Sequence, residues 1–446
     1  MKLAMRRTLQ HPARIVPIAF LLAIAIGTVL LLLPVARAGP GGAPLLVALF
    51  TSTSAVCVTG LTVVDTPTYW SPFGEVIILA LIQVGGLGIM TLATLLGLLV
   101  SRRLGLSQRL LAQAESRVGL GEVRGLLVRI AVTMLIFQGG LAIVLAGRFW
   151  LGYNYPFGKA VWYGVFHGVS AFNDAGFALF SNNMIGFVGD WWICLPLIIA
   201  VIVASLGYPV LFELIRELRK PAFWTVHTRL TVVGTAVLLV IGFGLVLAFE
   251  WGNPGTLGPL GVADKILAAM FQGTMPRTAG FNSIDYGQAT PETIALTDGL
   301  MFIGGGSAGT AGGIKVTTFF LLAYVIWAEV RGEPDVVVGR RRIAEGAQRQ
   351  ALTVALLGVA VVALGTLALL LATDQSADAV LFEAAAAFAT AGMSTGITGT
   401  LPPQAQVILI ILMYVGRVGT VAVASAMALR VRHRLYRYPE ERPIVG

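Results

Sequence analysis

Charged residues are scarce in this sequence. Lysine, arginine, aspartate and glutamate make up 12% of the 446 residues, about half of their share in a typical soluble protein. Hydrophobic residues, in contrast, make up 57% of the chain. A soluble domain of this length could not bury so much apolar surface in one core, whereas a lipid bilayer can accommodate it. The composition therefore predicts an integral membrane protein.

Cysteine and histidine are also rare, with two and four residues respectively. Cys57 and Cys194 lie far apart in apolar sequence, and no Cys/His spacing typical of a metal site occurs. These absences argue against a structural disulfide, a thiol catalyst and a metal cluster. Because the apolar stretches hold few acidic or basic side chains, the sequence indicates neither an enzyme nor a bound cofactor.

Seven apolar stretches are long enough to cross a bilayer, which takes roughly 20 helical residues. They are Ile15–Val35, Val76–Val100, Ile130–Leu151, Trp191–Leu214, Leu230–Phe249, Ala351–Ala372 and Val407–Leu429. The first is too long for the core of a signal peptide, and no small-residue cleavage site precedes a soluble domain. It is therefore expected to be a membrane span.

The net charge of +9 is concentrated in five basic patches between or beyond these stretches. The patches hold 24 of the 31 lysines and arginines and fall in residues 1–14, 101–129, 216–229, 331–349 and 430–442. Basic residues beside membrane spans stay in the cytoplasm, so both termini are expected there. Each segment between two patches must leave and return, and the simplest total is eight spans. No basic cluster on a soluble domain indicates nucleic-acid binding.

The four segments between the patches form an internal repeat. Each contains a long apolar run, a shorter run, a turn with glycine and a second long run. The repeats are expected to cover residues 1–109, 110–222, 223–345 and 346–446, with a cytoplasmic tail at the end. The shorter runs, of about half a membrane thickness, are Ala43–Val56, Lys159–Phe172, Asp264–Met275 and Ala377–Ala389.

The four turns are candidates for a cation filter. A short helix ending at each turn points its partly negative end there, and glycine permits positive φ at no steric cost. Carbonyls of such turns can replace the hydration shell of a cation. The candidate filter residues are Val58, Thr59, Gly60, Asn173, Asp174, Ala175, Gly176, Thr278, Ala279, Gly280, Thr390, Ala391 and Gly392. A single glycine turn would mean little, but four in matching positions favour a shared ion pathway.

Three carboxylates lie near these turns. Asp174 is within the second turn, and Asp65 and Asp285 follow the first and third. They could concentrate cations at the mouth of a pathway. They could equally be ordinary solvated loop residues.

The second long run of the third repeat is interrupted by glycine. Six glycines fall within residues 304–313, and each costs a helix roughly 1 kcal/mol relative to alanine. The expected result is a broken span with a flexible loop at membrane depth, because close helix packing accounts for isolated glycine pairs but poorly for such a run. The candidate gate residues in this loop are Gly304, Gly305, Gly306, Ser307, Gly309, Thr310, Gly312, Gly313 and Lys315.

Arg417 occupies the matching place in the fourth repeat, so two of the four copies are expected to depart from the rest. An arginine within a span costs about 2.5–3.5 kcal/mol on insertion scales and usually faces a cavity or a partner. Beneath the filter its charge would hold back a cation unless a carboxylate or a movable loop compensated. Arg417 is therefore predicted to form a gate with the Gly-rich loop, and it could also bind carbonyls of the broken span.

These residues resemble the Trk/Ktr/HKT superfamily of potassium transporters. The similarity rests on residues 51–62, on Pro276–Asn282 and on the fourth turn, and it extends over essentially the whole chain. Because the chain starts directly with the first repeat, it is more similar to the KtrB branch than to the longer TrkH branch. One departure is the second turn, where relatives often have Asn-Asn-Ala-Gly and this chain has Asp174.

The resemblance implies an all-α polytopic fold of four parallel helix–pore helix–helix repeats in pseudo-fourfold arrangement around one pore. It implies potassium uptake, with potassium held by filter carbonyls, across a bacterial plasma (inner) membrane. It further implies a homodimer mounted on a cytoplasmic RCK-type, KtrA-like nucleotide-binding subunit. In the superfamily, serine in the first turn accompanies sodium selectivity, and here that position is Gly60.

Other functions remain open on the residues alone. A secondary transporter with a midplane site would be expected to have inverted repeats, whereas these four all begin on the cytoplasmic side. A membrane enzyme would need clustered acid, base or metal-binding residues, and a scaffold would not need four glycine turns. The sequence is compatible with passive transport and with transport stimulated by, or coupled to, sodium.

Overall fold

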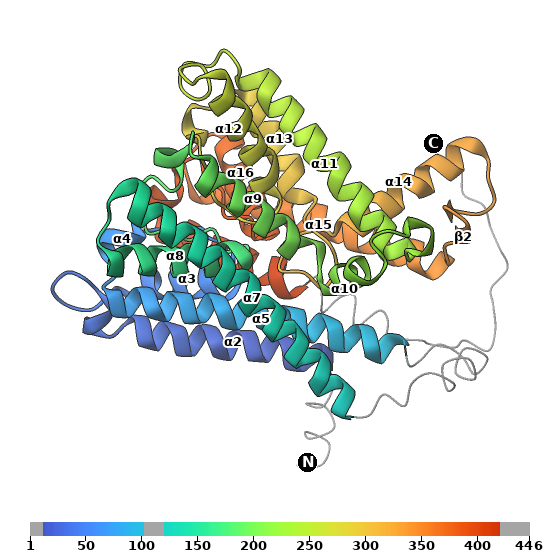
Figure 1. Cartoon of the computed structure of the whole chain (residues 1–446), viewed down its shortest axis with the longest axis horizontal. Helices are drawn as coiled ribbons and strands as arrows, with labels where there is room; N and C mark the ends of the chain where they lie inside the picture. The colour runs from blue at the N-terminus through green and yellow to red at the C-terminus, as the bar shows by residue number, and fades with distance from the viewer. Residues whose placement is uncertain (1–11, 102–119, 420–446) are drawn as a thin grey trace.

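The computed structural model describes residues 12–101 and 120–419, with side chains for residues 17–88 and 125–419. The chain in these ranges is mostly helical (Figure 1). The long helices and the helix pairs that replace them are α2 (Pro12–Leu31), α5 (Pro72–Ser101), α7 (Leu120–Tyr153), α9 (Trp191–Leu206) with α10 (Tyr208–Glu217), α11 (Val226–Glu250), α13 (Pro291–Phe302) with α14 (Val316–Arg331), α15 (Glu345–Ala372) and α17 (Pro403–Tyr414).

Four short helices lie between these long ones, as the sequence predicts. They are α3 (Leu45–Val56), α8 (Phe157–Phe172), α12 (Val262–Thr274) and α16 (Ala377–Ala389). Their ends agree with the predicted runs within two residues. Asp264 and Asp378 lie in the first turns of α12 and α16, where a carboxylate favours the helix dipole.

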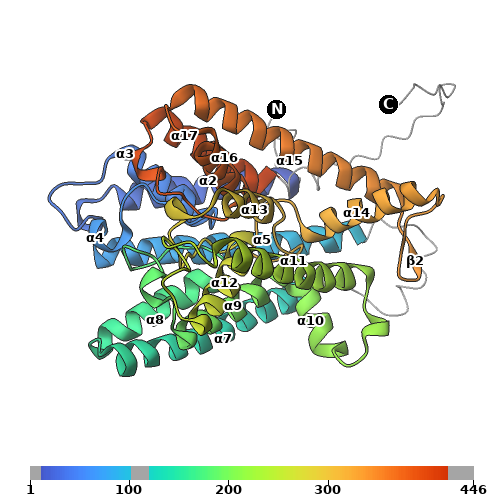
Figure 2. The ribbon, with the colours of Figure 1, turned by 90° about the horizontal axis from the view of Figure 1, so that it is seen from above.

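Each short helix packs against the long helix that precedes it in the chain. The pairs α2–α3, α7–α8, α11–α12 and α15–α16 are all in contact, and α17 returns to pack against α3. Figure 1 shows α2 and α5 on one side of the molecule and α11 and α14 on the other, and Figure 2 shows α7 and α8 along the edge opposite to α15 and α17. A small helix α4 (Thr66–Tyr69) lies at the end opposite to the hairpin of β1 (Val337–Val338) and β2 (Arg341–Arg342).

Three helical segments in the described residues are long and apolar enough to cross a membrane: Gly125–Tyr153, Val226–Glu250 and Glu345–Ala372. The bent pair α9–α10 would make a fourth, and α2, α5 and α17 contribute shorter apolar helices. Large side chains on these helices are exposed, among them Ile143, Val240 and Leu371. This outer apolar surface is what a lipid environment requires. The predicted total of eight spans stays a prediction.

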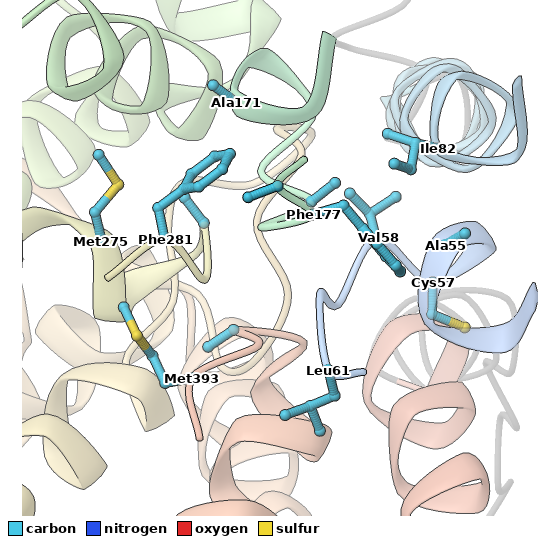
Figure 3. Close-up of a cluster of buried hydrophobic side chains, with 14 of the residues drawn as sticks. Ala55, Cys57, Val58, Leu61, Ile82, Ala171, Phe177, Met275, Phe281 and Met393 are labelled. Atoms are coloured by element: carbon cyan, nitrogen blue, oxygen red, sulfur yellow. The ribbon is translucent and has the colours of Figure 1, made fainter. Parts of the chain in front are cut away.

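The centre of the fold holds the residue that follows the glycine in each predicted turn. Leu61, Phe177, Phe281 and Met393 are each at most 1% exposed and belong to one cluster of buried side chains (Figure 3). The four turns therefore lie at the centre of the chain's largest core, surrounded by protein.

The second long runs of the repeats differ from one another. In the first repeat, α5 is continuous. In the third, no helix covers residues 303–315 between α13 and α14, and in the fourth, residues Val415–Gly419 form a π-helical turn. Residues 420–429 of the last predicted span lie outside the described part.

The second repeat also departs from a straight helix, which the sequence interpretation missed. The chain bends by 101° between α9 and α10 at Gly207, whose φ is 88°. Only glycine reaches this φ without steric cost. The expectation that only the third and fourth copies depart is therefore wrong.

The packing of α11 on α12 depends on a glycine contact that can be tested. A β-carbon on Gly242 would lie 2.8 Å from the carbonyl oxygen of Gly273, whereas one on Gly244 would meet nothing within 4 Å. Both glycines gain helix propensity on substitution by alanine. We expect Gly242→Ala to destabilise the protein by about 1–3 kcal/mol through overpacking.

Gly244→Ala is the matched control, and thermal unfolding in detergent measures both variants. Equal melting temperatures for the two variants would contradict the contact between α11 and α12.

Candidate functional site

The glycines of the four turns lie side by side in a closed ring. A β-carbon on Gly60 would lie 2.5 Å from the carbonyl oxygen of Ala175, and one on Gly176 would lie 2.8 Å from that of Ala279. In the same way, a β-carbon on Gly280 would lie 2.6 Å from the carbonyl oxygen of Ala391, and one on Gly392 would collide with that of Thr59. Each turn therefore touches the next, and the fourth touches the first. We call Gly60, Gly176, Gly280 and Gly392 the glycine ring.

The ring requires glycine at each of its positions. All four have positive φ, between 68° and 94°, where a side chain is strained. A β-carbon would also collide with a neighbouring carbonyl, as the distances above show. The positive φ and the clash with the neighbouring carbonyl both exclude a β-carbon at these four positions. The four turns can therefore approach one another only if the ring residues have no side chain.

Three of the four turns close in the same way on the helix that precedes them. The residue before the ring glycine donates its amide to a carbonyl five residues earlier, as Thr59 does to Ser54, Ala175 to Ser170 and Ala391 to Ala386. The residue before that has positive φ in each case, namely Val58, Asp174 and Thr390. Such turns satisfy helix-end carbonyls while redirecting the chain.

The third turn is built differently. Ala279 donates to Met275, only four residues earlier, and a 3-10 turn covers Met275–Arg277. Thr278 has a φ of −162°, so it lacks the positive φ of its counterparts in the other turns. Pro276 lies inside this segment and lacks an amide hydrogen, which accounts for the change in hydrogen bonding.

Buried and partly buried polar side chains that the sequence interpretation did not select hold the turns in place. Ser54 accepts the amide of Gly60 at 3.1 Å, and Gln83 accepts from Asn173 at 3.1 Å. Glu383, which is 0% exposed, accepts hydrogen bonds from Ser394 and Thr398 just beyond the fourth turn. Polar residues in apolar helices are the signal that could have identified them.

The three acidic residues near the turns have different surroundings. Asp65 accepts from Thr68 and Ser181 at 2.6 and 2.8 Å in an exposed loop. Asp285 is exposed and caps a short 3-10 turn through the amide of Gly287. Asp174 is 1% exposed, so it is neither a solvated loop residue nor a charge at an open mouth.

The segment of residues 303–315, which we call the Gly-rich loop, folds back against the rest of the site. Its ends are held together, because Ile303 and Ile314 form a β-bridge and Gly304 donates to Ile314 at 2.8 Å. Gly306 donates to the carbonyl of Ser205 at 2.7 Å, at the end of α9. A β-carbon on Gly312 would collide with the hydroxyl of Thr390 in the fourth turn. The loop thus packs against both the second-repeat bend and the turns.

Thr310, in the middle of this loop, joins two charged residues from other repeats. Its hydroxyl donates to the carboxylate of Asp174 at 2.5 Å, and its carbonyl accepts from Nη1 of Arg417. All three residues are at most 2% exposed. The predicted loop residue, the predicted arginine and one turn carboxylate therefore form a single buried network.

Two basic side chains, Lys315 and Arg417, face carbonyls of the Gly-rich loop. Lys315 donates its ammonium to the carbonyl of Ala311. Arg417 retains donors at Nε and Nη2 that have no partner within the described residues. Arg417 thus binds a carbonyl of the broken span, which was the structural alternative to a gating role, and Thr310 links it to Asp174 in the second turn.

The glycine ring itself presents backbone carbonyl oxygens. The described ranges contain no group of three histidine, cysteine, aspartate or glutamate residues that could hold a metal ion. The carbonyls of residues 59, 175, 279 and 391 lie between neighbouring turns of the ring, where they could contact a dehydrated monovalent cation.

Comparisons with known proteins agree on one family. A family model described as "TrkH: Cation transport protein" matches residues 6–432. "Ktr system potassium uptake protein B" of Bacillus subtilis (strain 168) is 38% identical over 436 residues, covering 98% of this chain and 97% of that protein. The protein of the same name from Vibrio alginolyticus is 36% identical and covers 97% and 94% respectively.

Two further comparisons concern function and fold. "Potassium/sodium uptake protein NtpJ" of Enterococcus hirae is 31% identical, covering 100% of this chain and 99% of that protein. The solved structure of the potassium transporter TrkH from Vibrio parahaemolyticus superposes with a TM-score of 0.69 at 20% identity. It covers 92% of this chain and 83% of that chain. The structural comparison shows a shared fold.

Proposed function

The chain belongs to the TrkH family of cation transport proteins, and on this premise we propose that it takes up potassium across the plasma membrane. Members of this family are membrane transport proteins and not enzymes. The relatives named for potassium uptake match over nearly their full lengths, which supports the same substrate here.

The observation that carries the proposal is the glycine ring. Four turns from four repeats, each preceded by a short helix, supply carbonyls around one point. The helices direct their partly negative ends toward the turns, which favours a cation. We assign potassium selectivity to carbonyls of Val58–Gly60, Asn173–Gly176, Thr278–Gly280 and Thr390–Gly392.

The Gly-rich loop and Arg417 are proposed to be the gate. The support is the network through Thr310, which holds the loop against the second turn and against the arginine. Asp174 partly compensates the charge of Arg417 while the loop is in place. Displacing the loop would free both groups and open a path below the ring.

The wider arrangement is proposed on the resemblance and on the ring. It comprises eight spans in four parallel repeats, with the predicted boundaries and with both termini in the cytoplasm. We further propose channel-like conduction, a homodimer and a cytoplasmic RCK-type nucleotide-binding subunit. The similarity to proteins named as parts of a Ktr system supports such a partner, and the potassium/sodium relative supports a role for sodium as a modulator or coupled ion.

The filter assignment predicts that Gly280→Ser weakens the preference for potassium over sodium. The new β-carbon would lie 2.6 Å from the carbonyl of Ala391 and 3.2 Å from the α-carbons of Gly176 and Gly392. We expect the selectivity ratio to fall about tenfold, corresponding to about 1.4 kcal/mol. Competition uptake into liposomes that contain the purified protein, with and without sodium, measures it.

The matched control is Gly396→Ser. Gly396 also has positive φ, at 95°, but a β-carbon there would meet nothing within 4 Å. It therefore shares the backbone strain without the collision in the ring. An unchanged selectivity ratio in a folded Gly280→Ser protein would show that the filter assignment is wrong.

The gate assignment predicts that deleting Gly305–Gly312 raises potassium flux. Ile303 and Ile314 lie side by side, so the chain can be rejoined with little movement of α13 or α14. We expect several-fold faster uptake in liposomes, since the deletion removes the segment that packs against the fourth turn. Flux equal to that of the unmodified protein, at equal melting temperature, would refute the gating role.

A narrower change tests the contact between Asp174 and Thr310. Thr310→Val keeps the shape of the side chain but removes the hydroxyl, and Asp174→Asn keeps a hydrogen-bond acceptor but removes the charge. We expect each to raise the flux about three- to tenfold, and the double variant to raise it no further than the larger single effect, because both changes act on one contact.

Thr53→Val is the control for these variants. Thr53 is a buried threonine of α3 whose hydroxyl has no hydrogen-bond partner in the described chain. Multiplicative effects in the double variant would mean that Asp174 and Thr310 do not act together on the gate.

A further inference from the structure

A pocket lies away from the glycine ring, at the end of the molecule that carries the β1–β2 hairpin. Its volume is about 260 Å³, and one wall is the segment that leads into α11 while the other is the hairpin that follows α14. The residues that line it are Ala222, Trp224, Val226, Arg229, Val338, Arg340 and Arg341. Figures 1 and 2 both show α10, α14 and β2 at this same end.

Three arginines and no acidic residue line this pocket. Carboxylates on the neighbouring segments have other partners: Asp335 pairs with Arg342 at 2.8 Å, and Glu217 pairs with Arg216 at 3.2 Å. Glu213 accepts hydrogen bonds from the hydroxyls of Thr225 and Thr228 at 2.9 and 2.7 Å. Arg229, Arg340 and Arg341 take part in no ion pair within the ranges that the structure describes. Three uncompensated guanidinium groups around one hollow repel one another, so a bound anion would stabilise the arrangement.

The position of these arginines is defined by the backbone. Arg229 donates from Nη2 to the carbonyl of Pro221 at 3.3 Å. Gly339 lies at the tip of the hairpin with a φ of 65°, and a β-carbon there would collide with Nη1 of Arg229. The positive φ favours glycine at the tip, and the absence of a side chain lets the guanidinium of Arg229 lie close to it. Val338 pairs with Arg341, so the hairpin presents Arg340 and Arg341 from this same turn.

We propose that this pocket binds a phosphate-bearing anion. Guanidinium groups present planar sets of donors that match phosphate oxygens. The anion could be the headgroup of an acidic phospholipid or a soluble phosphate, and both have the same recognition chemistry. Arg229 lies in the first turn of α11, and the neighbouring Phe223 is 72% exposed, which places the pocket where an apolar span begins and lipid headgroups would be within reach.

The anion would join two segments that flank the Gly-rich loop. The wall with Arg229 follows α10, which comes after the bend at Gly207, and the wall with Arg340 and Arg341 follows α14, which comes after the loop itself. Binding would hold the start of the third repeat, before α11, against the hairpin at its end. This inference goes beyond the proposed potassium uptake, and its test does not depend on it.

The test is a binding measurement on the purified full chain in nanodiscs. One arm compares phosphatidylglycerol with phosphatidylcholine as the lipid, and the other adds inorganic phosphate to phosphatidylcholine nanodiscs. Thermal unfolding is the readout, because a ligand that binds the folded state raises the melting temperature. The pocket variant is Arg340→Gln/Arg341→Gln. The control is Arg331→Gln/Arg349→Gln, which removes the same charge at two exposed arginines outside the pocket.

We expect phosphatidylglycerol or phosphate to stabilise the unmodified protein and the control. We expect the pocket variant to bind about 30-fold more weakly, because it lacks the two arginine contacts with the anion. A response to the lipid alone identifies a headgroup site, and a response to phosphate alone identifies a soluble anion. Stabilisation that is equally lost in the control, or absent from the unmodified protein in both arms, overturns the proposal. Arg229→Gln provides a second pocket variant on the opposite wall, and it too must weaken binding.

Discussion

Backbone that leaves a helix inside a membrane needs partners for its amides and carbonyls, because lipid offers none. This constraint governs the centre of the chain. The four turns are non-helical, and each is enclosed by the others and by a large buried residue, such as Phe281. Their amides bond back to the short helices, and so the carbonyls before the ring glycines are left between neighbouring turns. The arrangement that satisfies the backbone is thus also the one that offers oxygens to a cation.

The same constraint explains why the Gly-rich loop is well packed despite its composition. Its amides and carbonyls bond to one another across the Ile303–Ile314 bridge and to the end of α9. Its glycines allow close contact with the carbonyls of Ser205 and Leu206 and with the hydroxyl of Thr390. Glycine here provides both the absence of helix and a tight fit, so a loop of this kind can be flexible when released and ordered when docked.

The sequence predicts the parts of this fold that depend on local pattern. It places the four short helices within two residues, because apolar length and turn glycines define them. It does not predict the bend at Gly207, because α9 and α10 together read as one apolar run and a single glycine is a weak signal. The sequence also does not reveal that Glu383 and Gln83 hold the turns by hydrogen bonds, because these contacts depend on which turn lies beside each residue in space. Asp174 is unusual in the sequence, but its contact with Thr310 joins residues 136 positions apart, a pairing that no local pattern reveals.

The differences among the four copies follow from two incompatible demands. A ring of carbonyls needs four equivalent turns, and the glycines at residues 60, 176, 280 and 392 meet that need. A gate needs an element that has two positions, which four equivalent spans around an axis would not provide. The second, third and fourth copies depart from a straight helix at corresponding places, by a bend, a loop and a π-turn, and these departures are what the proposed gate would use. The Gly-rich loop connects these departures, since Gly306 donates to Ser205 beside the bend of the second copy and Thr310 accepts from Arg417 in the π-turn of the fourth. Because the proposed gate is shared among three copies, a substitution in the gate residues of any one copy should change the potassium flux through the glycine ring.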